Sequence, residues 1–280
     1  MDTLWSVRRP VSDLRPGDHA CLAYAGEDEF QHVVGAYVRG GLRAREAVLY
    51  LTGDAAAAVP GVPPRAAHRL LTVIAADEGP RARLDPEAVR DALAAEVARA
   101  DRHGVRAVRI IADLTWALRR PDGLEVLLAC EEHLERITAP STRVTAICPL
   151  DRRRCDAADL EALRARHAVR AAPDPEFEDP VLTIVRTFQP AGLSLSGELD
   201  ASRHAVLDQA LAILPAGRDI HLDMAGLGFI DLGAINLLAD VAGRAGTGSV
   251  VLDRMAPEMR AVLDTVGWAR LPGLRVGAPA

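Results

Sequence analysis

His19 and Cys21 carry metal-binding side chains and lie two residues apart in the segment HACLAY, residues 19–24. Neighbouring side chains of a strand point to opposite faces, so residues two apart share a face. The pair would supply two ligands to a transition metal, and His167 or Cys148 could complete the site. The other interpretation is that both side chains pack at a strand end, with one hydrogen bond to His19. We favour this second interpretation and assign no metal ligands.

A group of acidic residues and one histidine could instead support hydrolysis. Asp113 follows an apolar run, and Glu131, Glu132 and His167 lie further along the chain. Carboxylates and imidazoles serve metal-dependent hydrolases as ligands and as general bases. Spacing alone does not bring these residues together. We keep a metal-dependent hydrolase or ATPase-like enzyme as the alternative, and expect no catalytic residues and no cofactor.

The composition excludes several enzyme classes. All 33 basic residues are arginine, so no lysine is present for a phosphate-binding loop, a Schiff base or a general base. The turn AGEDEFQ, residues 25–31, contains one glycine and three carboxylates, and carboxylates repel phosphate. We therefore predict that the chain is not an enzyme.

Aromatic and arginine side chains near the ends of expected strands could contact a small molecule. Tyr24 and Trp116 would line an apolar pocket at the carboxyl ends of strands, where open α/β sheets bind ligands, or be ordinary core. Arginines 152–154 could hold an anion, although pairing with nearby aspartates in a solvated turn is the simpler role. The candidate ligand-binding residues are His19, Cys21, Tyr24, Asp113, Trp116, Arg152 and Arg153.

Strands and helices alternate along the first 172 residues. Apolar runs predict strands, and helical spacing predicts the helices between them. We expect Glu27 or Asp28 to cap the first helix, Gly40-Gly41 to end or interrupt it and Pro86 to open another. This alternation predicts a mostly parallel sheet covered on both faces. The expected strands span residues 19–24, 47–52, 70–74, 105–113 and 144–149.

The 280-residue length accommodates two domains. The acidic segment PDPEFEDP, residues 173–180, predicts a linker between a domain at 1–172 and a domain at 181–280. The net charge is −6, and no segment longer than Arg152–Arg154 is strongly basic, so we expect no direct contact with nucleic acid. No apolar run reaches the length of a membrane span or of a signal peptide. We therefore expect a cytoplasmic protein without membrane contact.

Three segments of the second domain carry a family resemblance: LSLSGELDAS (193–202), DIHLDMAGLGFIDLGAINLLADV (219–241) and MRAVLDTVGW (259–268). In this order they resemble the STAS domain of anti-sigma factor antagonists. The resemblance implies a small α/β domain that binds a partner protein, usually a kinase-type anti-sigma factor.

The sequence departs from that family's pattern where the family is phosphorylated. The family has Asp-Ser-Ser-Gly and phosphorylates the second serine, whereas this chain has Asp231-Leu232-Gly233-Ala234. Neither Leu232 nor Gly233 offers a hydroxyl to receive the added negative charge. The resemblance therefore implies a partner surface at Asp200, Asp231, Leu232 and Gly233 that works without phosphorylation at the usual serine. Asp231 is also a candidate helix cap.

Most of the segment 11–172 resembles the MEDS domain, the sensory domain named for methanogen and methylotroph DcmR-type regulators. The matching stretches are GDHACLAYAGEDEFQHVVGAYVRGGLRAREAVLYLTGD (17–54), RIIADLTWAL (109–118) and AICPLDRRRCDAADLEALRARH (146–167). The family's Tyr-Asp-x-Arg-like sequence is here Leu150-Asp151-Arg152-Arg153. The resemblance implies a RecA/KaiC-like framework, which here lacks the residues of a phosphate-binding loop.

The two resemblances together predict a degenerate RecA/KaiC-like three-layer α/β domain followed by a small STAS α/β domain. They imply a non-catalytic bacterial signalling regulator of the anti-sigma factor antagonist type. Its STAS domain would bind an anti-sigma factor or a related kinase-type regulator, and its first domain would respond to a small-molecule ligand or a partner. A scaffold that binds no ligand is the alternative.

Overall fold

The computed structural model describes residues 6–53, 56, 58–63, 68–75, 84–215, 217–244, 248–265, 267 and 271–277. The chain divides into two compact units, residues 1–174 and 175–280. Of the segment expected to be a linker, Pro175–Glu178 forms an edge strand of the second unit, with Phe177 packed against that unit's core. A strand with proline at its first position is compatible with a sheet edge.

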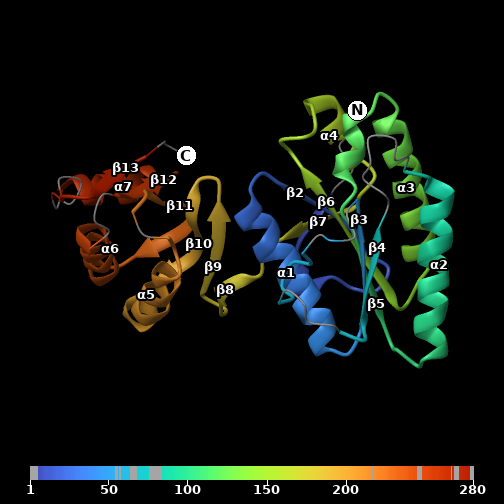
Figure 1. The fold of residues 1–280 in the computed structure, drawn as a ribbon. Coiled ribbons are helices and arrows are strands. Elements are labelled where there is room, and N and C mark those ends of the chain that lie inside the picture. Colours follow the sequence, from blue (N-terminus) through green and yellow to red (C-terminus); the bar gives the residue numbers. More distant parts are fainter. Residues whose placement is uncertain are drawn as a thin grey trace. The chain divides into compact units, whose positions relative to one another are not determined.

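The first unit is built on a parallel sheet whose strand order is β1-β7-β2-β6-β5-β3-β4 (Figure 1). All its described strand pairs are parallel, as the alternation of strands and helices predicted. The sequence did not indicate the two short strands β1 and β7. The strands are β1 (Val7–Pro10), β2 (His19–Tyr24), β3 (Ala47–Thr52), β4 (Leu71–Ala75), β5 (Val108–Ala112), β6 (Val144–Asp151) and β7 (Val169–Ala172).

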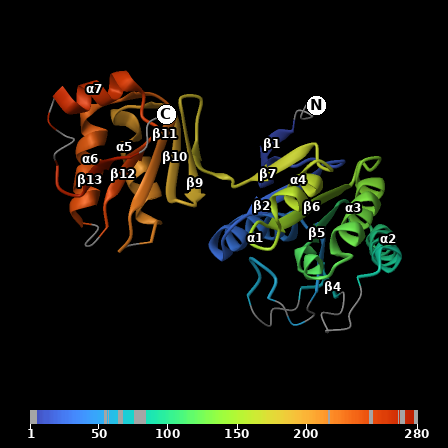
Figure 2. The ribbon, with the colours of Figure 1, turned by 90° about the horizontal axis from the view of Figure 1, so that it is seen from above.

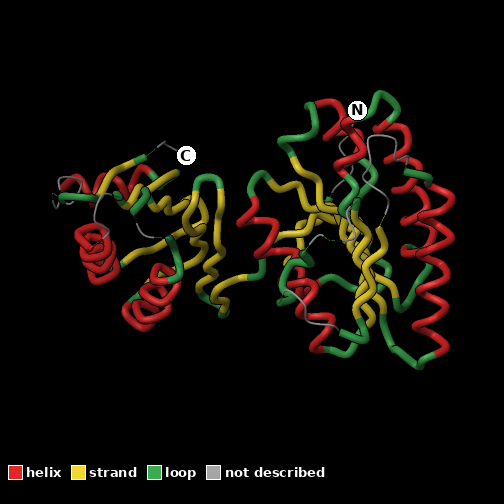
Figure 3. The backbone as a smooth tube through the Cα atoms, in the orientation of Figure 1, coloured by secondary structure: helices red, strands yellow, loops and turns green. Residues whose placement is uncertain are grey.

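Helices cover both faces of this sheet and give three layers, with α1 on one side and α2 and α3 on the other (Figures 1 and 3). Alternating residues of β3 enter separate cores: Val48 and Tyr50 pack with α1, and Leu49 and Leu51 pack with α2 and α3. Short 3-10 helices lie at Val11–Asp13 and Thr115–Arg119. The α-helices are α1 (Glu27–Arg43), α2 (Pro86–Arg102), α3 (Gly123–Thr138) and α4 (Ala157–Arg164).

The ends of α1 differ from those expected. Gly26 occupies the capping position, without a side-chain hydrogen bond, so neither Glu27 nor Asp28 caps the helix. The helix also continues through Gly40-Gly41 to Arg43. A Cβ atom at Gly41 would lie 2.8 Å from Arg109 Cδ, so this glycine permits close packing of the helix on the sheet. By contrast, Asp85 caps α2 and Pro86 opens it, as expected.

The second unit contains a six-stranded sheet in the order β13-β12-β11-β10-β9-β8, with β9 to β12 visible in Figure 2. Strand β9 is antiparallel to β8 and β10, and the remaining pairs are parallel. Its three α-helices contribute apolar residues to one core with the sheet. The strands are β8 (Pro175–Glu178), β9 (Leu182–Phe188), β10 (Ala191–Leu199), β11 (Ile220–Ile230), β12 (Val250–Asp253) and β13 (Leu274–Val276), and the helices are α5 (His204–Ala212), α6 (Leu232–Arg244) and α7 (Pro257–Thr265).

A 3-10 helix at Ala201–Arg203 precedes α5. No helix in the described ranges is long and apolar enough to cross a bilayer.

Candidate functional site

The first candidate site lies at one end of the second sheet, where β10 and β11 stop. Leu199 pairs with Ile230 in parallel register, and the following residues are Asp200 and Asp231. Parallel strands end at the same edge of a sheet, so the two carboxylates are neighbours. The structure thus brings together Asp200 and Asp231, which lie 31 positions apart in sequence, through strand pairing.

Asp231 begins α6 and holds its first turn. Its Oδ1 accepts a hydrogen bond from the backbone N–H of Ala234 at 2.7 Å and lies 2.7 Å from His204 Nε2. Partial burial raises the pKa of Asp231, but these two hydrogen bonds outweigh it and hold the pKa below its usual range. A negative charge at a helix N-terminus is also favoured by the helix dipole. Asp231 is therefore a charged cap, and part of its acceptor capacity is engaged by His204.

Gly233 and Leu232 have different surroundings at this site: Gly233 lies against His204, and Leu232 is exposed to solvent. A Cβ atom built on Gly233 would lie 2.4 Å from His204 Cε1, so the imidazole occupies the space that a larger residue's side chain would need. Leu232 is 56% exposed and is available to a partner. Asp200 accepts from the backbone and hydroxyl of Ser202 and pairs with Arg203. The result is an exposed apolar residue beside two partly engaged carboxylates.

The second candidate site is a buried cluster on one side of the first sheet. It comprises His19 on β2, Cys148 on β6, Glu131 on α3 and His167 between α4 and β7. One donor atom from each residue lies within 4.8 Å of all the others. His19 Nε2 is 3.0 Å from Glu131 Oε2 and 3.2 Å from Cys148 Sγ, and the thiol donates to the same oxygen at 3.2 Å. His167 Nε2 is also 3.2 Å from Glu131 Oε2.

The outer nitrogen of each imidazole has its own partner. His19 Nδ1 lies 2.9 Å from Glu135 Oε2, and His167 Nδ1 lies 2.9 Å from the carbonyl oxygen of Leu163. A carbonyl or carboxylate oxygen only accepts, so each Nδ1 carries the hydrogen. The two rings lie with centroids 4.3 Å apart. Both imidazoles are therefore fixed with Nε2 directed into the cluster.

Burial and charge act in opposite directions on the ionisable groups of the cluster. Burial alone would raise the pKa of Glu131, but His167 and His19 outweigh it and hold the pKa well below its usual range. Burial lowers the pKa of His19, and the hydrogen bonds to Glu131 and Glu135 reverse this and raise it. Burial and the charge of Glu131 raise the pKa of Cys148 well above its usual value. The cluster thus contains a charged carboxylate and, without a cation, a neutral thiol.

The residues expected around His19 are only partly brought together. Cys21 lies opposite Cys148 in the strand register but does not belong to the cluster, and burial raises the pKa of Cys21 to about 11. His19 also has three polar neighbours, rather than the single hydrogen bond expected. Of the residues considered for hydrolysis, Glu132 is exposed and pairs with Arg136, and Asp113 contacts Tyr50. These two residues therefore do not converge with Glu131 and His167.

Family comparisons assign both units. The model described as MEDS, the methanogen/methylotroph DcmR sensory domain, matches residues 18–168, more than half of the chain. The chain belongs to this family. A second model, described as Mlab, STAS domain, matches residues 182–275. The MEDS match includes the whole buried cluster, and the STAS match includes Asp200 to Gly233. No curated protein matches the chain.

The carboxyl edge of the MEDS sheet carries most of the remaining candidate residues. Tyr24 ends β2, and Asp113, just beyond β5, accepts a hydrogen bond from the Tyr50 hydroxyl at 3.3 Å. Burial raises the pKa of Asp113 to about 6. Arg153 pairs with Asp151 at 2.8 Å, the role expected in a turn. These contacts place two tyrosines and an easily protonated carboxyl at the edge where α/β sheets commonly bind ligands.

Trp116 and Arg152 contribute differently to this edge. Trp116 is buried in the core shared with α2 and α3, and its Nε1 has no hydrogen-bond partner in the part of the chain that the structure describes. The Arg152 side chain is exposed, while its backbone N–H donates to the Tyr24 carbonyl. Trp116 is thus a core residue, and Arg152 connects β6 to β2 through its backbone.

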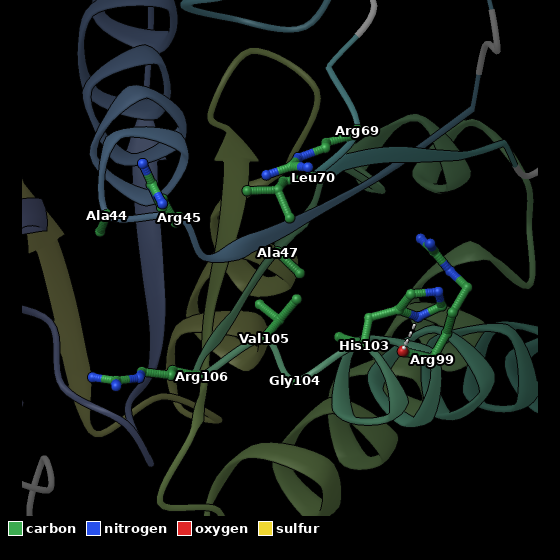
Figure 4. Close-up of a pocket in the computed structure, with 11 residues that line it drawn as sticks. Ala44, Arg45, Ala47, Arg69, Leu70, Arg99, His103, Gly104, Val105 and Arg106 are labelled. Carbon is green, nitrogen blue, oxygen red and sulfur yellow. Dashed lines mark hydrogen bonds between the residues drawn. The ribbon is translucent and has the colours of Figure 1, made fainter.

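The opposite, amino edge of the MEDS sheet has an open hollow of about 760 Å³ that the sequence did not indicate. Arg45, Arg69, Arg99 and Arg106 surround it (Figure 4). His103 is held by a hydrogen bond of 2.8 Å between its Nδ1 and the Arg99 carbonyl. The hollow therefore has a positive rim, formed by surface arginines rather than by buried polar groups.

Two residues that contact the candidate sites, Glu135 and His204, were missed from the sequence. Glu135 lies one helical turn after Glu131, and residues at this spacing share a helix face. That spacing was a usable signal for a second carboxylate near His19. His204 offered no comparable signal, because its contact with Asp231 depends on the packing of α5 beside α6.

Proposed function

We propose that this protein is a non-catalytic signalling regulator whose STAS domain binds a partner without phosphorylation at the usual position. The partner class is an anti-sigma factor or a related kinase-type regulator. The MEDS domain would control this binding in response to a small molecule or another partner. The observation that carries the proposal is the start of α6, where Asp231 is a charged cap and Gly233 lies under the His204 imidazole.

The charge and surface of this helix start support binding that does not require phosphorylation. The family's covalent switch adds negative charge where this chain has Gly233, which has no hydroxyl. A carboxylate, Asp231, already provides negative charge at the same turn, with Asp200 beside it. Leu232 adds an exposed apolar contact in the middle of this surface. Control of binding would therefore come from the MEDS domain rather than from phosphate at this turn.

A capture experiment with the full chain tests the proposal. Wild type, Asp231→Arg and Leu232→Arg would be used as bait in lysate of the native host, and bound proteins identified by mass spectrometry. Val262→Arg is the matched control, because Val262 is also an exposed aliphatic residue of the STAS domain but lies on α7. We expect wild type and Val262→Arg to retain a kinase-type anti-sigma factor, and the two helix-start variants to lose it.

Two results would count against the proposal. One is the absence of any such regulator from the wild-type capture, or its retention by both helix-start variants. The other is release of the captured regulator when the pair is incubated with ATP and magnesium, with phosphate found on a serine or threonine of the STAS domain, such as Ser202, by mass spectrometry of peptides.

A further inference from the structure

We propose that the MEDS domain binds one Zn²⁺ ion through His19 Nε2, Glu131, Cys148 Sγ and His167 Nε2. The four residues come from β2, α3, β6 and the segment before β7, so a bound ion would connect the sheet to a covering helix and a loop. This inference does not depend on partner binding by the STAS domain.

The distances between the donor atoms suit a tetrahedral ion. Zinc bonds of about 2.0–2.1 Å to nitrogen or oxygen and about 2.3 Å to sulfur place neighbouring ligands about 3.3–3.6 Å apart. In the structure, Glu131 Oε2 lies 3.0 Å from His19 Nε2, 3.2 Å from Cys148 Sγ and 3.2 Å from His167 Nε2. The four donor atoms all lie within 4.8 Å of one another, so side-chain adjustments that lengthen the shorter distances and shorten the longer ones would bring them to this spacing.

The hydrogen-bond partners leave the inner nitrogens in need of a cation. Each Nδ1 faces an oxygen that can only accept, so a neutral imidazole has its lone pair on Nε2. That lone pair would face the Glu131 carboxylate, which is also only an acceptor, so a cation, either a proton or a metal ion, must lie between them. His167 Nε2 is buried and forms no hydrogen bond of acceptable geometry within the described residues, although it lies 3.2 Å from Glu131. A metal ion between these atoms accepts both lone pairs and the carboxylate charge.

The outer hydrogen bonds match those of known metal-binding histidines. Such histidines donate their second N–H to a carboxylate or a backbone carbonyl, which fixes the ring and its tautomer. Glu135 provides the carboxylate for His19, and Leu163 provides the carbonyl for His167. Both arrangements are in place around this cluster.

Charge balance and donor type select the ion. A Cys148 thiolate and the Glu131 carboxylate carry two negative charges, which one divalent cation neutralises inside a site closed to solvent. Two imidazoles and a thiolate exclude Mg²⁺ and Ca²⁺, which prefer oxygen ligands. All four ligands are protein side chains, as in structural zinc sites. We therefore infer an ion that stabilises the MEDS domain rather than one that activates water.

Metal uptake by the untagged full chain tests this site directly. The protein would be stripped with a chelator, dialysed and titrated with Zn²⁺ or Co²⁺, with metal content measured by elemental analysis. We expect about one ion per chain, a higher thermal midpoint with Zn²⁺, and a Co²⁺ spectrum with tetrahedral and thiolate-to-metal bands. The Co²⁺ spectrum needs no substitution, so the test stands even if variants fail to fold.

Two variants test the proposed ligands, and a third variant is the control. Cys148→Ser and His167→Gln should lose most of the bound metal and the thermal shift, and Cys148→Ser should also lose the thiolate band. Cys21→Ser is the control, because Cys21 is buried opposite Cys148 in the register but is not a proposed ligand. Failure of stripped wild type to take up either ion would overturn the proposal, as would equal uptake by Cys148→Ser and wild type with the fold verified by circular dichroism.

Discussion

The buried cluster of the MEDS domain and the helix start of the STAS domain place similar side chains in opposite settings. Each contains at least one carboxylate and at least one histidine. In the cluster, four residues from separate elements meet away from solvent, so each charge depends on its neighbours. At the start of α6, Asp231 interacts with its own helix and with one histidine, and Leu232 faces solvent. The comparison separates a buried site whose groups contact one another from a site that exposes an apolar residue to solvent.

Replacing the central carboxylate of the cluster should have the largest effect. Glu131→Gln removes the charge that both histidines and Cys148 contact, and we expect a loss of about 3 kcal/mol in the stability of the MEDS domain. Chemical denaturation in the presence of chelator measures this loss without a contribution from bound metal. The neighbouring Glu132→Gln is the control, with an expected change under about 0.5 kcal/mol because Glu132 forms only a surface ion pair. Equal effects of the two variants would show that the buried Glu131 carboxylate stabilises the domain no more than the exposed Glu132 carboxylate does.

Restoring a hydroxyl at the helix start should have an intermediate effect. Gly233→Ser forces its Cβ against the His204 ring, and we expect the STAS domain to lose about 1–3 kcal/mol of stability. The same substitution at Gly243, also in α6, is the control, because a Cβ there meets no atom within 4 Å. Denaturation of both variants, and of Gly233→Ser combined with His204→Ala, measures the effect. If His204→Ala does not relieve the loss, the cause is not the imidazole.

A smaller, pH-dependent effect is expected at Asp113, which is less buried than the cluster and whose carboxylate accepts a hydrogen bond from the Tyr50 hydroxyl. Its folded pKa, raised to about 6, exceeds the ordinary value, so the folded state favours the protonated carboxyl. The protonated Asp113 carboxyl therefore stabilises the folded state fully at pH values below the ordinary pKa of aspartate. This stabilisation is lost as the pH rises through about 6. Asp113→Asn should therefore resemble wild type near about pH 4 and be more stable by about 1–2 kcal/mol near about pH 8.

Thermal unfolding of wild type and Asp113→Asn across this pH range measures the difference, with the exposed Asp122→Asn as control. A difference between Asp113→Asn and wild type that does not change with pH would show that folding does not raise the pKa of Asp113.

Local patterns predicted the elements better than they predicted their ends or their contacts. The strand at His19–Tyr24 and the start of α2 at Pro86 follow from apolar runs and capping residues. Gly40-Gly41 was misread as a stop because its close approach to Arg109 is not visible in the local sequence. The absence of a hydroxyl at Gly233 could be read from the sequence, because it requires only the alignment of one short motif and no tertiary contact.

The sequence by itself determined the two α/β domains, the absence of lysine chemistry and the altered helix start, because composition and short motifs carry these properties. Only the tertiary structure decided which polar residues meet. His19 and Cys148 lie 129 positions apart, yet become neighbours because β2 and β6 pair in the parallel sheet. Glu131 joins them because α3 packs on that face, and His167 because the chain returns toward β7 beside β2. Strand order and helix packing set these contacts, and neither is encoded in the spacing of the residues.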